Sequence, residues 1–153
     1  EEGELRRNFQ GYTDDSADAL IGLGASSIGK LPQGYVQNMV ATGEYERMAE
    51  ADGLCIARGI ALSVEDRVRA FVIERIMCDF SLDLSALAAL FGPASLPAVE
   101  EAQQFAEGDR DGLVHLEAGR FALTETGKPF ARSIAATFDT YLSNGRGRHS
   151  LAV

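Results

Sequence analysis

A glycine-rich run near the start of the chain, Gly22-Leu-Gly-Ala-Ser-Ser-Ile-Gly29, has the residue types of a loop that binds phosphate. In the dinucleotide-binding pattern G-x-G-x-x-G, glycines let the backbone approach a pyrophosphate, and an acidic residue about twenty positions later binds the ribose. Here the third glycine comes two positions late, and Glu44 or Glu46 fits the acidic position only loosely. Two other interpretations stay open: the glycines let a strand end pack tightly, or they let a ligand approach it.

Four basic side chains could bind an anion in the N-terminal region: Arg6, Arg7, Lys30 and Arg58. Such residues are usually solvated surface charges. If they face a ligand, we expect it to carry carboxylates or phosphates, because the planar guanidinium group matches both. We find no Ser-His-Asp set, pair of catalytic carboxylates or phosphate loop, so the sequence indicates no catalytic residue.

The sulfur and imidazole groups do not form a metal-binding pattern. Cys55 and Cys78 are 23 positions apart, and neither His115 nor His149 lies near them in the sequence. A zinc or iron–sulfur site built from this chain alone is therefore not expected. Both cysteines have apolar neighbours, which predicts reduced, partly buried thiols in a cytoplasmic protein.

The charge balance excludes two classes of partner. Fourteen Lys and Arg against 23 Asp and Glu give a net charge of −9, so we expect neither general nucleic-acid binding nor attraction to anionic membranes. The longest uncharged stretch, 84–99, is interrupted by glycine and proline, and it is too short and broken to span a membrane.

The elements that would position these groups differ between the two ends of the chain. Residues 8–13 alternate like a short strand, and the apolar run 19–23 predicts a buried strand of the kind found in parallel α/β sheets. Two strands cannot cover a sheet, so residues 1–34 are expected to be the terminal strands of a larger one. The chain opens on Glu1-Glu2-Gly3 without a methionine, which suggests a piece of a longer protein. Residues 35–62 are interpreted as a connecting helical segment.

Residues 63–143 predict a mainly helical domain. Ser63 and Asp66 form a capping box before a helix with apolar residues at helical spacing. Further helices are expected over 84–91 and 97–107, then a hairpin over 113–124, then a last helix from Thr126, and residues 144–153 form a flexible tail. The last helix is expected to bury Phe130, Ile134, Phe138 and Tyr141 or Leu142. This order is typical of a winged-helix-like domain, and the overall fold class is α+β. The helix over 97–107 carries several carboxylates, which argues against DNA binding through it.

Several motifs in order resemble one enzyme family along most of the chain. They are Asn8-Phe-Gln-Gly-Tyr-Thr13, Leu20-Ile-Gly-Leu-Gly-Ala-Ser-Ser-Ile28, Tyr35-Val-Gln-Asn38, Arg58-Gly-Ile-Ala-Leu62, Ile76-Met-Cys-Asp-Phe80, Asp111-Gly-Leu-Val114, Leu123-Thr-Glu-Thr-Gly127 and Phe138-Asp-Thr-Tyr-Leu142. The chain is similar to the C-terminal part of the oxygen-independent coproporphyrinogen III oxidases, radical S-adenosylmethionine (SAM) enzymes of haem biosynthesis.

The resemblance implies a parent enzyme with an incomplete α/β barrel, of which residues 1–34 would be the last strands, holding a [4Fe-4S] cluster and SAM. Such an enzyme decarboxylates two propionates of coproporphyrinogen III to vinyl groups, giving protoporphyrinogen IX. Its partners are the porphyrinogen and an electron donor. The family's cluster motif, C-x-x-x-C-x-x-C, is absent from this sequence. The chain alone is therefore expected to hold no cluster or SAM and to be inactive.

The resemblance also implies roles for particular residues. Phe9, Gln10 and Ile28 match positions that line the SAM region in the family, with Gln10 offering an amide hydrogen bond and Ile28 an apolar contact. Tyr35, Gln37, Asn38 and Arg58 match family motifs and are predicted to contact the substrate. Because the substrate carries four propionates, Arg58 is the first candidate among them.

Two alternatives remain beside this interpretation. The chain could be a stand-alone acidic, winged-helix-like protein-interaction module, or the C-terminal part of a related haem chaperone. The Phe9-Gln-Gly-Tyr-Thr13 run favours the oxidase over the chaperone, since the chaperones lack it. Strands without a sheet argue against a natural stand-alone module.

Overall fold

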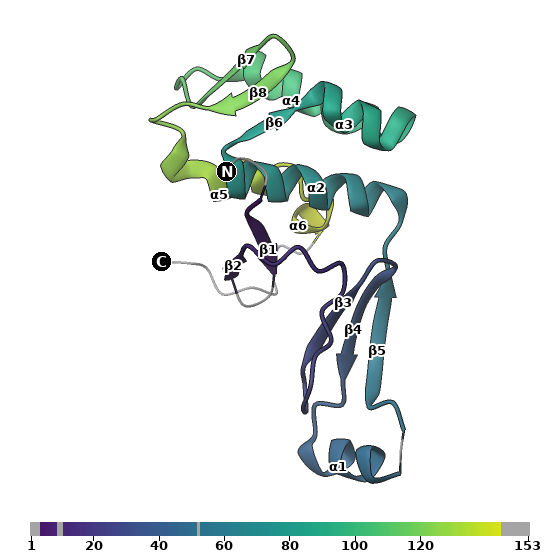
Figure 1. Ribbon diagram of the computed structural model, residues 1–153. Helices are drawn as coiled ribbons and strands as arrows, with labels where there is room; N and C mark the ends of the chain where they lie inside the picture. The colour runs from purple at the N-terminus through teal and green to yellow at the C-terminus, as the bar shows by residue number, and fades with distance from the viewer. Residues whose placement is uncertain (1–3, 9–10, 52, 145–153) are drawn as a thin grey trace.

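The computed structural model describes residues 4–8, 11–51 and 53–144. A three-stranded sheet in the N-terminal region projects from a helical C-terminal region, and the two are joined where the sheet's last strand leads into the long helix α2 (Val64–Asp79) (Figure 1). Among the described residues, none of the helices has the length and apolar composition needed to cross a membrane. The mixed α and β content agrees with the expected α+β class.

A short hairpin begins the described chain. Strands β1 (Arg6–Asn8) and β2 (Gly11–Thr13) pair antiparallel, so the expectation of one strand over 8–13 is wrong. The hairpin lies beside α2 (Figure 1). Arg75 of α2 donates from Nη2 to the Leu5 carbonyl at 2.9 Å, which ties the start of the chain to this helix.

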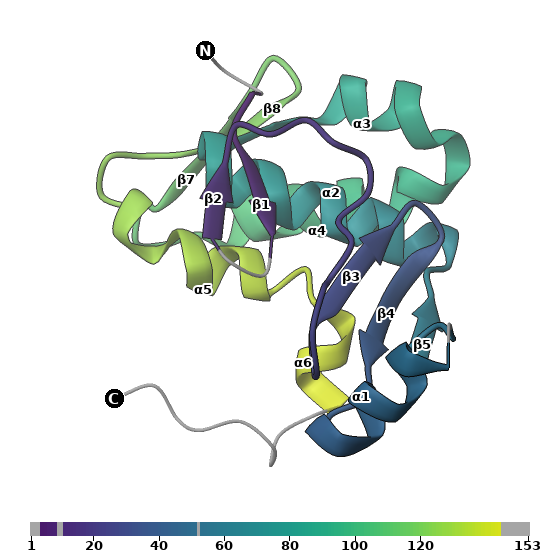
Figure 2. The ribbon, with the colours of Figure 1, turned by 60° about the horizontal axis from the view of Figure 1, so that its bottom comes forward.

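The second sheet corrects the expected helical segment over 35–62. Strands β3 (Ile28–Leu31), β4 (Gly34–Asn38) and β5 (Ile56–Ala61) form an antiparallel sheet in sequence order. Among the described residues of that segment, the only helix is α1 (Thr42–Glu50), which lies at the end of the sheet away from α2 (Figures 1 and 2). Tyr35 and Val36 have the aromatic and β-branched side chains that favour strands.

The apolar run 19–23 does not form the expected parallel strand. Leu20 makes a single antiparallel bridge to Lys30, and the rest of the run has no strand partner among the described residues. The following loop needs turn conformations, with φ of +100° at Gly24 and +61° at Ser26, so the extended backbone cannot continue. Ile21 and Leu23 are left 69% and 85% exposed.

The C-terminal region follows the order helix, strand, helix, helix, strand, strand, and then short helices. Its elements are α2, β6 (Ser81–Asp83), α3 (Leu84–Phe91), the 3₁₀ turn η1 (Gly92–Ser95), α4 (Leu96–Gly108), β7 (Val114–Glu117), β8 (Arg120–Leu123), η2 (Lys128–Phe130), α5 (Ala131–Ala136) and α6 (Thr140–Asn144). The antiparallel sheet has the order β6-β8-β7. The sequence did not predict β6, which has only three residues.

Local capping chemistry sets the predicted helix boundaries. The Ser63 hydroxyl accepts from the Asp66 amide while Asp66 accepts from the Ser63 amide, so the predicted capping box is confirmed. Asp83 caps α3 by accepting from the amides of Ser85 and Ala86. The hydrogen bond from the Ser85 hydroxyl, together with those from the two amides, lowers the pKa of the Asp83 carboxyl. The predicted helix over 84–91 matches α3. The predicted helix over 97–107 differs from α4 by one residue at each end. The predicted hairpin over 113–124 is confirmed by the pairing of β7 with β8.

The last predicted helix is divided into η2, α5 and α6. Ile134 and Phe138 are buried as expected, at 2% and 1% exposure. Phe130, Tyr141 and Leu142 are half exposed or more, so their predicted burial is wrong. The predicted flexible tail lies outside the described residues, except for residue 144 at the end of α6.

All buried hydrophobic residues of the described chain lie between Val68 and Phe138. They come from the helices α2, α3, α4 and α5, from the strands β6, β7 and β8, and from Phe138 after α5. Phe121 of β8 is fully buried, at 0% exposure. Phe105 and Phe138 pack edge-on against the Phe121 ring. The N-terminal strands contribute only Gly29 and Gly34 to the buried set, so the β3–β5 sheet has no apolar core of its own among the described residues.

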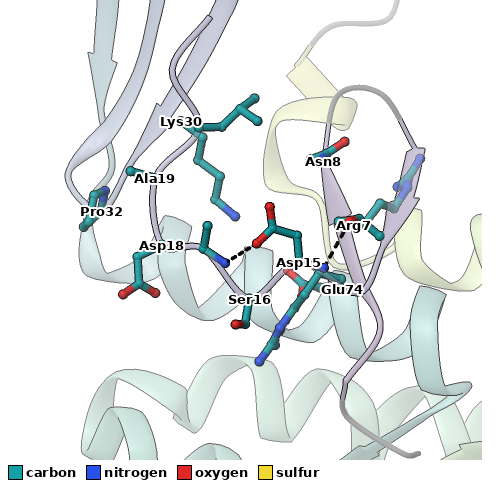
Figure 3. Close-up of a pocket in the computed structure, with 13 residues that line it drawn as sticks. Arg7, Asn8, Asp15, Ser16, Asp18, Ala19, Lys30, Pro32 and Glu74 are labelled. Atoms are coloured by element: carbon teal, nitrogen blue, oxygen red, sulfur yellow. Dashed lines mark hydrogen bonds and ion pairs between the residues drawn. The ribbon is translucent and has the colours of Figure 1, made fainter.

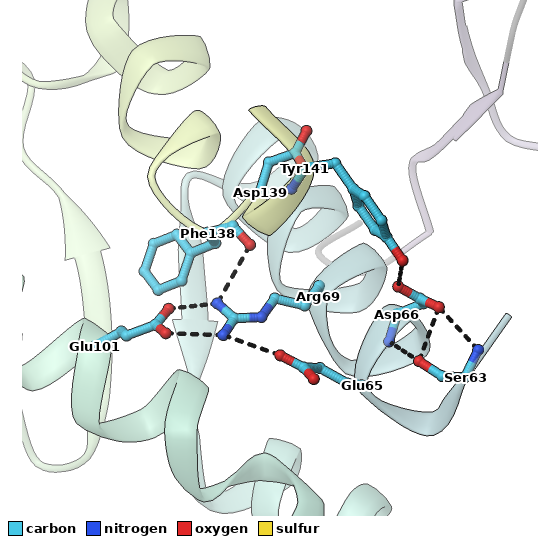
Figure 4. A network of polar contacts seen from close by, with 8 residues as sticks. All are labelled: Ser63, Glu65, Asp66, Arg69, Glu101, Phe138, Asp139 and Tyr141. Atoms are coloured by element: carbon cyan, nitrogen blue, oxygen red, sulfur yellow. Dashed lines mark hydrogen bonds and ion pairs between the residues drawn. The ribbon is translucent and has the colours of Figure 1, made fainter. Parts of the chain in front are cut away.

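A network around Arg69 joins three elements of the C-terminal region (Figure 4). Both of its Nη atoms donate to the carboxylate of Glu101 on α4, and Nη1 also donates to the Phe138 carbonyl at 3.3 Å. Glu65 makes a longer ion pair at 3.5 Å. A two-pronged arginine–carboxylate pair fixes direction as well as distance, so the network sets how α2, α4 and the chain after α5 pack.

Candidate functional site

One face of the β3–β5 sheet brings together most of the described residues predicted to bind ligands. The register places Ile28 opposite Gln37 and Gln37 opposite Arg58, and side chains opposite one another lie on the same face. Two residues along, Lys30 pairs with Tyr35 and Tyr35 with Ile60, on that same face. A shallow hollow of about 440 Å³, called here the Arg58 hollow, is lined by Ile28, Tyr35, Val36, Gln37, Arg58, Gly59 and Ile60.

Gln37 orients the arginine of this hollow. The Arg58 Nε donates to the Gln37 Oε1 at 2.8 Å, and the Gln37 Nε2 donates to the Ser26 carbonyl at 3.1 Å. Within the described part of the chain, the Nη atoms of Arg58 have no hydrogen-bond partner, and the side chain is exposed. This geometry leaves the outer edge of the guanidinium group available to a carboxylate.

Tyr35 is half-buried and lines the Arg58 hollow. Its burial, and secondarily the negative charge of Glu74, raise the pKa of the Tyr35 hydroxyl above its ordinary value. A raised pKa keeps the Tyr35 hydroxyl protonated at neutral pH, as in an ordinary tyrosine.

Asn38 does not line the hollow and instead holds the glycine-rich loop. Its Nδ2 donates to the carbonyls of Gly22 and Gly24, each at 3.0 Å. The Gly24 amide in turn donates to the Tyr45 hydroxyl of α1 at 3.0 Å. These contacts fix the loop in place, and a direct contact between Asn38 and substrate stays a prediction.

The glycines of the loop serve close packing of the backbone. A Cβ at Gly22 would lie 2.8 Å from the Ile28 carbonyl oxygen, so no other residue fits without a shift. The loop leads into antiparallel strand β3 and not into a helix, which removes the helix N-terminus on which a dinucleotide pyrophosphate would sit. The structure therefore contradicts the dinucleotide-binding interpretation and supports the packing one.

The residues predicted to contact SAM are only partly placed. Phe9 and Gln10 lie outside the described residues, while Ile28 is 37% exposed on β3 and offers an apolar wall to the Arg58 hollow. Among the described residues there is no group of three or more His, Cys, Asp or Glu side chains that could hold a metal ion. The described side chains therefore do not fit an iron–sulfur cluster. Cys78 is buried and Cys55 partly buried, both as free thiols, as predicted.

A second hollow, called here the Lys30 hollow, lies on the other side of Tyr35. It is lined by Arg7, Asn8, Lys30, Tyr35, Ala70, Ile73 and Glu74. In the sequence, Arg7 and Lys30 are distinguished only as two of the four basic residues of the N-terminal region. The available signal was the spacing of Lys30, which is two residues beyond Ile28 and so shares its face once β3 is known to be a strand.

Comparisons with known proteins agree along the length of the chain. The HemN C-terminal domain family matches residues 62–130. The oxygen-independent coproporphyrinogen III oxidase of Bradyrhizobium diazoefficiens is 46% identical over 153 residues, covering 100% of this chain and 34% of the relative. That of Cereibacter sphaeroides is 44% identical over 139 residues, covering 91% of this chain and 31% of the relative.

A solved structure shows the same correspondence in three dimensions. The coproporphyrinogen III oxidase (HemN) of Escherichia coli, described as a radical SAM enzyme, matches with a TM-score of 0.81 and 34% identity over 92% of this chain and 32% of that one. The chain thus spans about a third of the length of the proteins it matches. In sequence and in fold, the chain corresponds to the C-terminal part of the HemN-type, oxygen-independent coproporphyrinogen III oxidases.

Proposed function

We propose that this chain forms the C-terminal part of an enzyme that converts coproporphyrinogen III to protoporphyrinogen IX without oxygen. The observation that carries the proposal is 46% identity to such an oxidase along the whole chain. In this proposal the remaining two thirds of the parent enzyme hold the [4Fe-4S] cluster and most contacts to SAM, and the parent works in the cytoplasm with an electron donor.

Two structural features support the finer assignment of the parts. The order α2-β6-α3-α4-β7-β8 with a β6-β8-β7 sheet supports a winged-helix-like domain over residues 63–143. The β3–β5 sheet lacks an apolar core among the described residues, and its strand β5 is exposed along its whole length. Proteins usually cover or pair an exposed sheet edge. In the parent enzyme, a neighbouring barrel domain would cover β5 and the sheet.

The chain's own residues would bind and orient the substrate. Arg58, oriented by Gln37, would pair with a propionate carboxylate of the porphyrinogen, and the protonated Tyr35 hydroxyl would donate to the same or a neighbouring oxygen. Ile28 would supply apolar contact to the cofactor region. SAM, when bound in the parent enzyme, supplies the hydrogen-atom abstraction on the propionate side chain.

A chimaeric enzyme tests the proposal. The C-terminal third of the Bradyrhizobium relative is replaced by this chain, and protoporphyrinogen formation is measured under anaerobic conditions after oxidation to the fluorescent porphyrin. We expect the chimaera to be active and the relative truncated before that third to be inactive.

Within that chimaera, changing Arg58 to glutamine removes the charge while keeping a polar side chain. We expect KM for coproporphyrinogen to rise about tenfold, equal to about 1.4 kcal/mol of lost binding, with a smaller change in kcat. Arg132→Gln is the matched control, because Arg132 is an exposed arginine on α5 that lines neither hollow. An unchanged KM for Arg58→Gln would remove Arg58 from the substrate site.

A further inference from the structure

The Lys30 hollow gathers positive charge on the same sheet face as Arg58. It shares Arg7, Asn8, Lys30 and Glu74 with a larger depression, which is also lined by the segment that follows β2 (Figure 3). The Lys30 side chain points into this space from β3 (Figure 3). Its walls come from the hairpin, the sheet and α2, so three separate elements bring these groups together.

Neither cation of this hollow is paired with a carboxylate within the described part of the chain. The Lys30 ammonium has no hydrogen-bond or ion-pair partner there, and the Arg7 guanidinium lies over the Tyr12 ring, 5.9 Å from its centroid. The acidic neighbour Glu74 is already paired with Arg75 at 2.9 Å and with Arg6 at 3.4 Å.

The remaining acids of the larger depression are Asp15 and Asp18. Asp15 accepts the Ala17 amide at 2.9 Å and so closes its own turn (Figure 3). The side chain of Asp18 points away from Lys30 (Figure 3). Neither carboxylate lines the Lys30 hollow itself, where Arg7 and Lys30 face only Glu74. The Lys30 hollow therefore has an excess of positive charge and suits an anion.

The position of this hollow relative to Arg58 is set by the sheet. Lys30 and Arg58 are two strands apart and two residues apart along the strand direction, with Tyr35 between them. With strands about 4.8 Å apart and about 3.4 Å per residue, their Cα atoms are about 12 Å apart. Tyr35 lines both hollows, so one ligand crossing Tyr35 could reach both cationic sites.

We propose that Arg7 and Lys30 form a second carboxylate site, which binds another propionate of the same tetrapyrrole whose first propionate pairs with Arg58. This inference rests on the proposed function and adds a specificity element to it. Two cationic sites at a fixed separation select a rigid macrocycle with several acidic arms over a ligand with one carboxylate.

Equilibrium binding of coproporphyrin III to the chain tests the second site. This porphyrin is the stable oxidised relative of the substrate and keeps all four propionates, and its tetramethyl ester provides the uncharged comparison. Binding is followed by porphyrin fluorescence for the wild-type chain, the Arg7→Gln/Lys30→Gln double variant, Lys30→Arg, Arg58→Gln and the control Arg132→Gln. Circular dichroism verifies that each variant is folded.

We expect the double variant to bind coproporphyrin about tenfold more weakly than the wild type, with a smaller dependence on salt. Lys30→Arg and Arg132→Gln should bind like the wild type, and the ester should bind all variants equally. Unchanged affinity in the double variant would overturn the second site. If Arg58→Gln still weakened binding in that case, the proposed function would stand without it.

Two other results would also overturn the inference. One is a wild-type chain that binds the acid no more tightly than the ester. The other is a double variant, made in the chimaeric enzyme that holds SAM, which loses affinity for SAM but keeps its affinity for coproporphyrin, because the carboxylate bound there would then belong to the cofactor.

Discussion

Replacing Phe121 by alanine is expected to lower the free energy of unfolding by about 3–5 kcal/mol. The Phe121 ring is fully buried at the centre of the C-terminal core and packs edge-on against Phe105 and Phe138, with centroids 6.1 Å and 6.2 Å away. Alanine would remove both ring contacts and leave a cavity walled by β8, α4 and the chain after α5. Urea denaturation followed by circular dichroism measures the change.

Phe130→Ala is the matched control for this experiment, since the Phe130 ring is 50% exposed. It removes the same atoms from the surface and should cost about 1 kcal/mol or less. Equal losses in the two variants would mean that the aromatic cluster around Phe121 is not the centre of the core.

Gly34→Ala is expected to disrupt the sheet that carries both hollows. A Cβ at position 34 would lie 1.9 Å from the Ile60 carbonyl oxygen, which is a backbone atom that cannot rotate away. Strands β4 and β5 would have to separate at this pair, at a cost of about 1–3 kcal/mol. Because Tyr35 follows directly and Arg58 lies on β5, coproporphyrin binding should weaken together with the protection of the β4 amides from hydrogen exchange.

Gly43→Ala provides the control, because a Cβ at Gly43 in α1 meets nothing within 4 Å. Alanine there should be neutral or slightly stabilising, since it favours the helix. If Gly34→Ala kept wild-type amide protection across β4 and β5, the tight approach of these strands would be wrong.

The C-terminal fold was predictable where local chemistry determines it. The capping box at Ser63 and Asp66, the stop at Gly92-Pro93 and the turn at Ala118-Gly119 each depend on neighbours in the sequence. Strand β6 was not predicted because its three residues become a strand only by pairing with β8, about forty residues further along the chain. The last helix was predicted too long because apolar spacing continues past position 137, where the helix is interrupted.

The N-terminal sheet was not predictable because its pairing is tertiary. Residues 35–62 carry apolar side chains at spacings that fit a helix, yet Tyr35 and Val36 pair on both sides within a sheet. The apolar run 19–23 was interpreted as buried, whereas the structure leaves Ile21 and Leu23 exposed. Its conformation is decided by the turn at Gly24 and Ser26.

The candidate site was predicted only as separate residues. The family resemblance indicated Ile28, Tyr35, Gln37 and Arg58, but only the strand register shows that they share one face. Lys30 was not predicted to belong to this site because its place beside Tyr35 follows only from the pairing of β3 with β4. Asn38 follows Gln37 along β4, and its side chain binds the loop carbonyls of Gly22 and Gly24. Their binding roles remain predictions.

The most direct test of the central proposal is the anaerobic turnover of the chimaera that joins the first two thirds of the Bradyrhizobium relative to this chain. We predict protoporphyrinogen formation within about tenfold of the intact relative, equal to about 1.4 kcal/mol in transition-state stabilisation. The truncated relative should form none. A chimaera that folds and holds its iron–sulfur cluster but forms no more product than the truncated relative would contradict the proposal that this chain completes the oxidase.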